Sequence, residues 1–145
     1  KIAGKPHRKK VTFAWNGEDV ADVFASMFAG TDEHYKYIDL PLSNYASGSF
    51  DKIVGAKGKV VGASMFSGYS YNEKSMLSLG IVDPDVKEGD GLTLSWGEPD
   101  GGSGKTSTER HKQAEIRVRV SPVPYSREAR EHYADDSWRT KQTTA

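Results

Sequence analysis

Short stretches in which apolar and polar residues alternate recur along this chain, and this alternation is typical of strands with one buried face. The clearest examples are residues 10–15, KVTFAW, and residues 114–120, AEIRVRV. Residues 51–66 predict two strands joined by a turn at 56–58, where Gly58 supplies a positive φ. Two further strands are predicted at 76–82 and 92–96.

The spacing of apolar residues lengthens after Asn16 to three or four, which is the period of an amphipathic helix. Asn16 or the acidic segment after it can cap this helix, and Gly30 ends it. The apolar stripe consists of Val20, Val23, Phe24, Met27 and Phe28. Residues 31–50 predict a short strand or extended segment that runs into an irregular loop at 44–48. Near the end of the chain, Ser126 can cap a brief helix over residues 127–133.

Residues 58–82 organise the chain, because two apolar runs there enclose a polar and aromatic segment. That segment, SGYSYN at 67–72, predicts a loop presented by two rigid strands. Ser67, Tyr69 and Tyr71 offer hydroxyl groups and aromatic faces, and the neighbouring glycine lets a ligand approach the backbone closely. An ordinary β connection has the same composition, so a binding loop and a plain connection both remain open.

Several short strands separated by turns, together with one helix near the start, predict an α+β fold that is mainly β. We expect a six-stranded antiparallel Greek-key barrel with an amphipathic helix near the N-terminus and a short C-terminal helix. Residues 1–135 are predicted to form this single domain, and residues 136–145 a polar, disordered tail.

The composition excludes several classes of function. The 20 basic and 20 acidic residues balance and are scattered, which argues against binding to nucleic acid or to an anionic membrane. The chain has no cysteine, so disulfides, thiolate metal sites and a cysteine nucleophile are excluded. No apolar run has the length of a signal peptide core or a membrane span, so a cytoplasmic location is expected. The absence of an initial methionine suggests a fragment or a processed chain.

Three patterns that suggest ligand chemistry have simpler explanations. GGSGKT at 101–106 resembles a phosphate loop, but Pro99 stands where its first glycine belongs, so a flexible, exposed hairpin tip over 97–109 is favoured. Four carboxylates lie within residues 83–90 and could bind a hard cation such as calcium. The ammonium of Lys87 among them would repel the metal ion, so a solvated turn is favoured. The histidines lack the pairing of metal ligands, so no metal site is predicted and they are interpreted as surface side chains: His7, His34, His111 and His132.

Arg127 follows the last predicted strand. A guanidinium fixed at this position could bind a carboxylate through two parallel hydrogen bonds. From the residues alone, an exposed arginine without a specific role is the favoured interpretation.

A family resemblance enters through motifs that occur in order over about ninety residues: GKVVG at 58–62, SGYS at 67–70, LGIV at 79–82, GLTL at 91–94 and SPVPY at 121–125. These motifs resemble the carboxy-terminal barrel domain of the glycine-cleavage T-protein (aminomethyltransferase) superfamily. Within it, residues 65–85 and 109–130 are similar to the tetrahydrofolate-dependent aryl O-demethylases that act on vanillate, syringate or 3-O-methylgallate. They depart from the glycine-cleavage enzyme, whose loop usually reads S-G-x-x-S-P-x-L.

The resemblance implies a domain of a methyltransferase that moves a methyl group from an aryl methyl ether to N5 of tetrahydrofolate. It implies that the barrel closes one side of a folate channel formed chiefly by two preceding domains, which hold the catalytic residues. No catalytic residue is therefore assigned here, and this fragment alone is expected to be inactive. Residues implied to face the cofactor are Ser67, Tyr69, Tyr71 and Arg127. The implied partners are the preceding folate-binding domains and a methylated small-molecule substrate.

Three alternatives remain open. The chain could be a glycine-cleavage-type aminomethyltransferase domain, or a stand-alone small-molecule binder with a deep pocket enclosed by its own residues. It could also be a non-catalytic interaction barrel that uses Phe50, Met65, Met76 and Trp96 against another domain or subunit.

Overall fold

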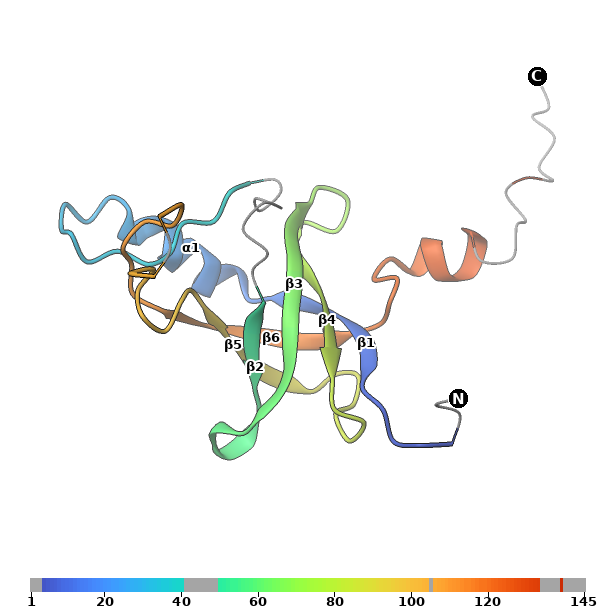
Figure 1. Cartoon of the computed structure of the whole chain (residues 1–145). Coiled ribbons are helices and arrows are strands. Elements are labelled where there is room, and N and C mark those ends of the chain that lie inside the picture. Colours follow the sequence, from blue (N-terminus) through green and yellow to red (C-terminus); the bar gives the residue numbers. More distant parts are fainter. Residues whose placement is uncertain (1–3, 41–49, 105, 134–138, 140–145) are drawn as a thin grey trace, which may run out of the picture.

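The chain folds into a closed barrel of antiparallel strands in the order β1, β4, β3, β2, β5, β6, and β6 returns to pair with β1 (Figure 1). The computed structural model describes residues 4–40, 50–104, 106–133 and 139. The strands are β1 (Lys9–Trp15), β2 (Asp51–Val54), β3 (Val60–Ser70), β4 (Ser75–Val82), β5 (Gly91–Trp96) and β6 (Ala114–Ser121). These six strands confirm the strands predicted from alternation.

The connectivity is that of a Greek key. β2, β3 and β4 follow one another as neighbours, and the long connection from β1 to β2 leaves β1 beside β4 rather than beside β2. A strand that returns past a three-stranded meander to pair with its far edge defines this topology. The predicted antiparallel Greek-key barrel is therefore confirmed.

The alternation of residue types decides which side chains fill the barrel. On β6, Ile116, Val118 and Val120 are at most 4% exposed, while Arg117 and Arg119 point outward. On β4 the inward position 80 is glycine, because the ring of Phe13 and the carbonyl oxygen of Ala63 occupy the space that a Cβ would need. The core is thus built by the inward residues of strands on all sides of the barrel.

Helix α1 (Gly17–Ser26) follows β1 directly and confirms the predicted amphipathic helix. The side chain of Asn16 caps it by accepting a hydrogen bond of 3.0 Å from the amide of Asp19. The helix ends earlier than predicted, and Phe28 is 84% exposed rather than part of a buried stripe. Val23, at 1% exposed, is the helical side chain that enters the core.

The structure corrects the predicted loop at 67–72. Strand β3 continues to Ser70, and only residues 71–74 form the turn to β4. The periodicity failed here because β3 contains a bulge: Met65 pairs with Leu79 and Gly68 with Leu77, so two residues of β3 face one of β4. The extra residue breaks the alternation that would have marked the segment as strand.

The remaining predicted segments are mostly confirmed. The turn at 56–58 has positive φ at Lys57 (60°) and Gly58 (73°). Residues 31–40 are largely irregular, with one isolated bridge between Tyr35 and Lys112, and the predicted loop at 44–48 lies outside the described residues. A short helix, η3 (Ala129–Tyr133), confirms the C-terminal helix. The predicted boundary at residue 135 and the tail lie outside the described residues, apart from Arg139.

Among the described residues, no helix has the length and apolar character needed to cross a membrane.

Candidate functional site

Tyr69 and Tyr71 lie at the end of the β3–β4 hairpin and form an aromatic pair. Their ring centroids are 5.3 Å apart and the rings are nearly perpendicular, at 80°. Tyr69 packs against the core, whereas Tyr71 is 71% exposed. The ammonium of Lys74 lies 5.7 Å from the centre of the Tyr71 ring. The hairpin therefore presents one anchored and one exposed aromatic ring beside a cation.

A pocket of about 360 Å³ opens between this hairpin and helix α1. Its walls include the aromatic side chains of Trp15, Phe24 and Tyr69, with Met76 from β4 and Lys74 from the turn. Trp15 is held in place because its Nε1 donates a hydrogen bond of 2.9 Å to the buried hydroxyl of Ser78. Aromatic walls with one cationic group suit a planar ring that carries a negative charge. Lys74 is part of this site although no pattern in the sequence indicates it.

Ser67 occupies the bulge of β3 rather than an exposed loop. Ser67 is only 8% exposed, so it lies within the barrel wall. Phe66, its neighbour in the bulge, has a φ of 51° and is 60% exposed. The bulge thus turns a serine inward and a phenylalanine outward.

Arg127 lies on a different element from the tyrosines. It belongs to the C-terminal helical segment, which Figure 1 shows projecting outward from the barrel after β6. Its side chain is 79% exposed, and its Nε donates hydrogen bonds of 2.8 Å to both carboxylate oxygens of Glu131. Arg127 therefore pairs with a carboxylate one turn later in its own helical segment.

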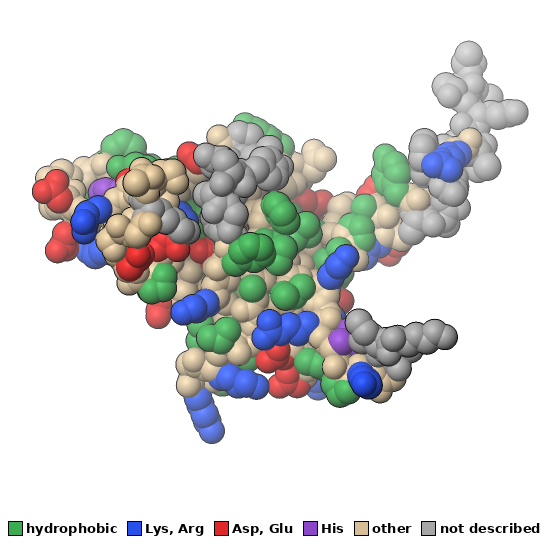
Figure 2. Space-filling view, viewed as in Figure 1, with side chains coloured by type: hydrophobic (Ala, Val, Ile, Leu, Met, Phe, Trp, Pro, Cys, Tyr) green, Lys and Arg blue, Asp and Glu red, His purple; other side chains and the backbone are tan. Residues whose placement is uncertain are grey.

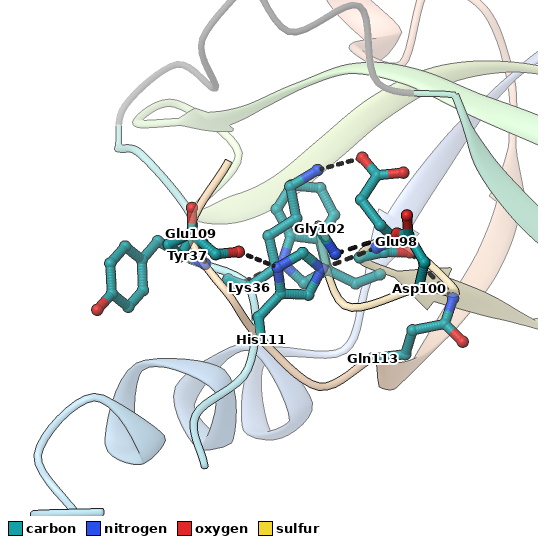
Figure 3. Close-up of polar contacts among 10 residues, drawn as sticks. Lys36, Tyr37, Glu98, Asp100, Gly102, Glu109, His111 and Gln113 are labelled. Carbon is teal, nitrogen blue, oxygen red and sulfur yellow. Dashed lines mark hydrogen bonds and ion pairs between the residues drawn. The ribbon is translucent and has the colours of Figure 1, made fainter. Parts of the chain in front are cut away.

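A second polar cluster lies in the loop between β5 and β6, where His111, Glu98 and Lys36 meet (Figure 3). His111 is 8% exposed, so its interpretation as a surface histidine is wrong. Its Nε2 accepts a hydrogen bond of 2.8 Å from the amide of Glu98, which places the ring proton on Nδ1, 2.7 Å from the carbonyl oxygen of Glu109. The imidazole closes the loop, because it joins the beginning of the loop to its end.

Lys36 completes this cluster. Its ammonium lies 3.3 Å from Oε1 of Glu98 and 5.1 Å from the centre of the Trp96 ring, and its side chain is 9% exposed. Its carbonyl oxygen accepts a hydrogen bond of 2.8 Å from Nε1 of Trp96. Sequence reasoning missed this cluster, although glycines at 97, 101 and 102 were a signal: all three have positive φ, as a tightly folded loop requires.

Two carboxyl groups, those of Asp19 and Asp100, have lowered pKa values because they accept hydrogen bonds that also hold the backbone in place. The side chain of Arg117 donates hydrogen bonds to Asp19 and lowers the pKa of that carboxyl group. The amides of Gly102 and Gly104, each 3.1 Å from an oxygen of Asp100, lower the pKa of that group. Both carboxylates are engaged in structural hydrogen bonds: Asp19 ties α1 to β6, and Asp100 shapes the loop.

Two of the carboxylates at 83–90 make contacts that stabilise the fold. Asp83 lies 3.0 Å from Nε of Arg8, and Asp90 accepts a hydrogen bond of 2.8 Å from the amide of Lys87. Within the part of the chain that the structure describes, no group of three or more His, Cys, Asp or Glu side chains could hold a metal ion.

The similarity of this chain to known proteins bears on the origin of the barrel. No protein-family model matches the chain. It is 45% identical over 143 residues to syringate O-demethylase of Sphingobium sp., in an alignment that covers 98% of this chain. The resemblance to the O-demethylase family is confirmed. The chain is also 36% identical over 128 residues to sesamin methylene transferase of Sinomonas sp., in an alignment that covers 82% of this chain.

The chain covers 30% of the length of the first relative and 26% of the second. The match therefore concerns a segment of each relative, and that segment corresponds to the barrel described above.

Proposed function

We propose that this chain is the carboxy-terminal barrel domain of a tetrahydrofolate-dependent enzyme that moves a methyl group from an aryl methyl ether to tetrahydrofolate. The observation that carries the proposal is the 45% identity to a syringate O-demethylase over 98% of this chain. The wider relationship to the glycine-cleavage T-protein stays a prediction.

The pocket beside the β3–β4 hairpin supports a role as a wall of the folate channel. Methyl transfer from an ether requires the donor carbon to be held in line with N5 and the leaving phenolate to be stabilised. Trp15, Phe24 and Tyr69 offer flat apolar surfaces against which a ring can be placed, and Lys74 offers a positive charge at the rim. The barrel supplies positioning, while the groups that transfer the methyl group belong to polypeptide outside this chain.

The proposed cofactor-facing residues have different parts in this picture. Tyr69 lines the pocket and Tyr71 extends beyond it, so both can contact the ligand directly. Ser67 acts from within the bulge by holding the strand that carries them. Arg127 meets the cofactor or a neighbouring domain from the C-terminal helix, and its exposed guanidinium would exchange Glu131 for that partner.

The proposed partners are the preceding folate-binding domains and a methylated small-molecule substrate, with the whole enzyme in the cytoplasm. Nucleic acid and membrane are not proposed as partners. The isolated chain is expected to have no methyltransferase activity, because one wall does not enclose a reaction site.

Calorimetric titration of the intact protein with tetrahydrofolate tests the proposal. We expect binding that Tyr71→Ala weakens and that Tyr37→Ala leaves unchanged, because both tyrosines are exposed but only Tyr71 lies at the hairpin. An intact protein that does not bind tetrahydrofolate refutes the proposal. Equal effects of the two substitutions refute the role of the hairpin alone.

Exposed apolar residues on β3 and β4 keep a non-catalytic interaction barrel as a second candidate, with a different docking surface from the one that the sequence suggested. Met76 and Trp96 are 5% and 2% exposed and belong to the barrel's own core, so they do not form a docking surface. Phe50 is 68% exposed and Met65 is half-buried, and other exposed apolar residues lie near Met65 on β3 and β4. This surface and a folate-dependent function are compatible.

A further inference from the structure

The outer face of β3 and β4 is apolar where the outer face of an antiparallel barrel is ordinarily polar. Cross-strand pairs join Ala63 to Ile81 and Met65 to Leu79, and Leu77 lies one pair further along β4. Leu79 is 48% exposed, and the others are half-buried without belonging to the core. Figure 2 shows hydrophobic side chains gathered over the middle of the face that β2, β3 and β4 form in Figure 1.

Phe66 adds an aromatic ring to this face at the bulge. Its φ of 51° is a conformation that glycine adopts freely but that costs energy for a residue with a Cβ. Its side chain is nevertheless 60% exposed. A strained backbone that holds a large apolar side chain in solvent is typical of a functional position. Aromatic side chains, phenylalanine among them, are also enriched in protein interfaces relative to the rest of the surface.

Lysines flank the apolar residues on both sides. Lys10 on β1 pairs with Ile81, and Lys52 on β2 pairs with Ala63, so the order across the barrel at this level is Lys10, Ile81, Ala63, Lys52. Both lysines are exposed. A surface that matches this arrangement has an apolar centre with carboxylates at its edges.

We propose that this β3–β4 face, defined as Ala63, Met65, Phe66, Leu77, Leu79 and Ile81, docks onto the remaining polypeptide of the parent enzyme. The inference rests on the proposed function for the existence of that polypeptide. More than two thirds of each relative lies outside its alignment with this chain, which is enough for a partner within the same protein. An apolar centre with a charged rim suits such a permanent contact, because permanent interfaces are more apolar than transient ones.

Hydroxyl-radical footprinting of the intact protein tests the proposal, with labelling of each phenylalanine measured by mass spectrometry. Phe66 and Phe28 have the same intrinsic reactivity, and in the barrel they are 60% and 84% exposed. If the face is free, labelling of the two residues follows these exposed fractions. We expect Phe66 to be labelled several-fold less than Phe28, with Leu79 protected together with it. Comparable labelling of Phe66 and Phe28 overturns the proposal.

A matched pair of substitutions gives a second readout. Phe66→Asp is expected to increase the labelling of Leu79 in the intact protein, because the face is released, whereas Phe28→Asp leaves it unchanged. Protection of Leu79 that persists with Phe66→Asp overturns the proposal. Protection that disappears on dilution to the monomer assigns the face to a second copy of the protein, which also overturns it.

The footprint is measured without folate, so it is independent of the cofactor. If Phe66 is protected from labelling in an intact protein that does not bind tetrahydrofolate, the proposed function is refuted but the proposed docking surface is not. An intact protein that binds tetrahydrofolate with Phe66 exposed refutes the docking surface alone.

Discussion

Ser78 is the centre of a buried hydrogen-bond network, and replacing it with alanine should destabilise the barrel more than the same change at its partner Ser64. Its hydroxyl oxygen accepts hydrogen bonds of 2.9 Å from Nε1 of Trp15 and 2.7 Å from the hydroxyl of Ser64. Ser78 and Ser64 are 2% and 1% exposed, so water does not replace a lost partner. Ser78→Ala therefore leaves two buried donors without an acceptor.

The expected magnitude follows from the number of donors. A buried polar group left unpaired costs about 1–3 kcal/mol, so Ser78→Ala should lower the free energy of unfolding by about 2–4 kcal/mol. Ser64→Ala should cost about 1 kcal/mol, because Trp15 then keeps its acceptor. For a domain of this size, the larger loss corresponds to a fall of roughly 5–15 °C in the melting temperature.

Urea unfolding followed by circular dichroism measures both variants without relying on tryptophan fluorescence. A double-mutant cycle with Trp15→Phe isolates the bond from indole to hydroxyl, since Ser78→Ala should cost less once the indole donor is absent. If Ser78→Ala costs no more than Ser64→Ala, or costs the same in both backgrounds, the reasoning about the shared acceptor is refuted.

Three further predictions concern packing, charge and the closing loop. Gly80→Ala should cost about 3 kcal/mol or more in thermal unfolding, because the new Cβ meets the Phe13 ring and a backbone carbonyl, whereas Gly91→Ala, with open space around it, serves as the control. Asp19→Asn should destabilise the protein at pH 7. The difference in unfolding free energy between this variant and the native protein should become smaller as the pH falls below about 4. The lowered pKa of Asp19 means that its stabilisation is complete above the ordinary carboxyl pKa and is lost as pH falls through the folded value. His111→Phe should speed hydrogen exchange at the Glu98 amide, which loses its acceptor, and leave exchange at Ile116 in the core unchanged.

Each of these predictions has a contrary outcome. Equal stability of the two alanine variants would show that β4 adjusts to a side chain at position 80. If the difference in unfolding free energy between Asp19→Asn and the native protein is constant from pH 7 to pH 3, the charge of the Asp19 carboxylate does not contribute to stability. Unchanged exchange at Glu98 would mean that His111 does not close the loop.

The strands and the first helix could be predicted because their patterns are local. Alternation on β6 separates inward valine and isoleucine from outward arginine, and Asn16 marks the start of α1 through its own side-chain oxygen. The family resemblance was also readable in the sequence, since its motifs lie on the strands and their ends. None of these inferences requires knowledge of which distant residues meet.

The candidate site was only partly predictable, because its components depend on distant contacts. Tyr69 and Tyr71 were identified as aromatic groups beside a glycine, but the pocket also needs Phe24 from α1 and Lys74 from the turn. His111 was interpreted as a surface histidine because its partner, the Glu98 amide, lies thirteen residues away and across the loop. One alternative places Met76 and Trp96 on a docking surface, because composition does not reveal which face of a strand is outside.

The stretch at residues 58–82 shows where this division lies. The order of its residues by itself determined two apolar strands that carry tyrosines at their junction, because alternation and residue type act over neighbouring positions. Only the closed barrel decided that Ser67 is buried, that Phe66 is exposed beside Leu79, and that Gly80 must remain glycine. The physical reason is the bulge in β3, because its extra residue changes which side chains face inward. The bulge is defined by the pairing of β3 with β4, which the sequence of β3 alone does not specify.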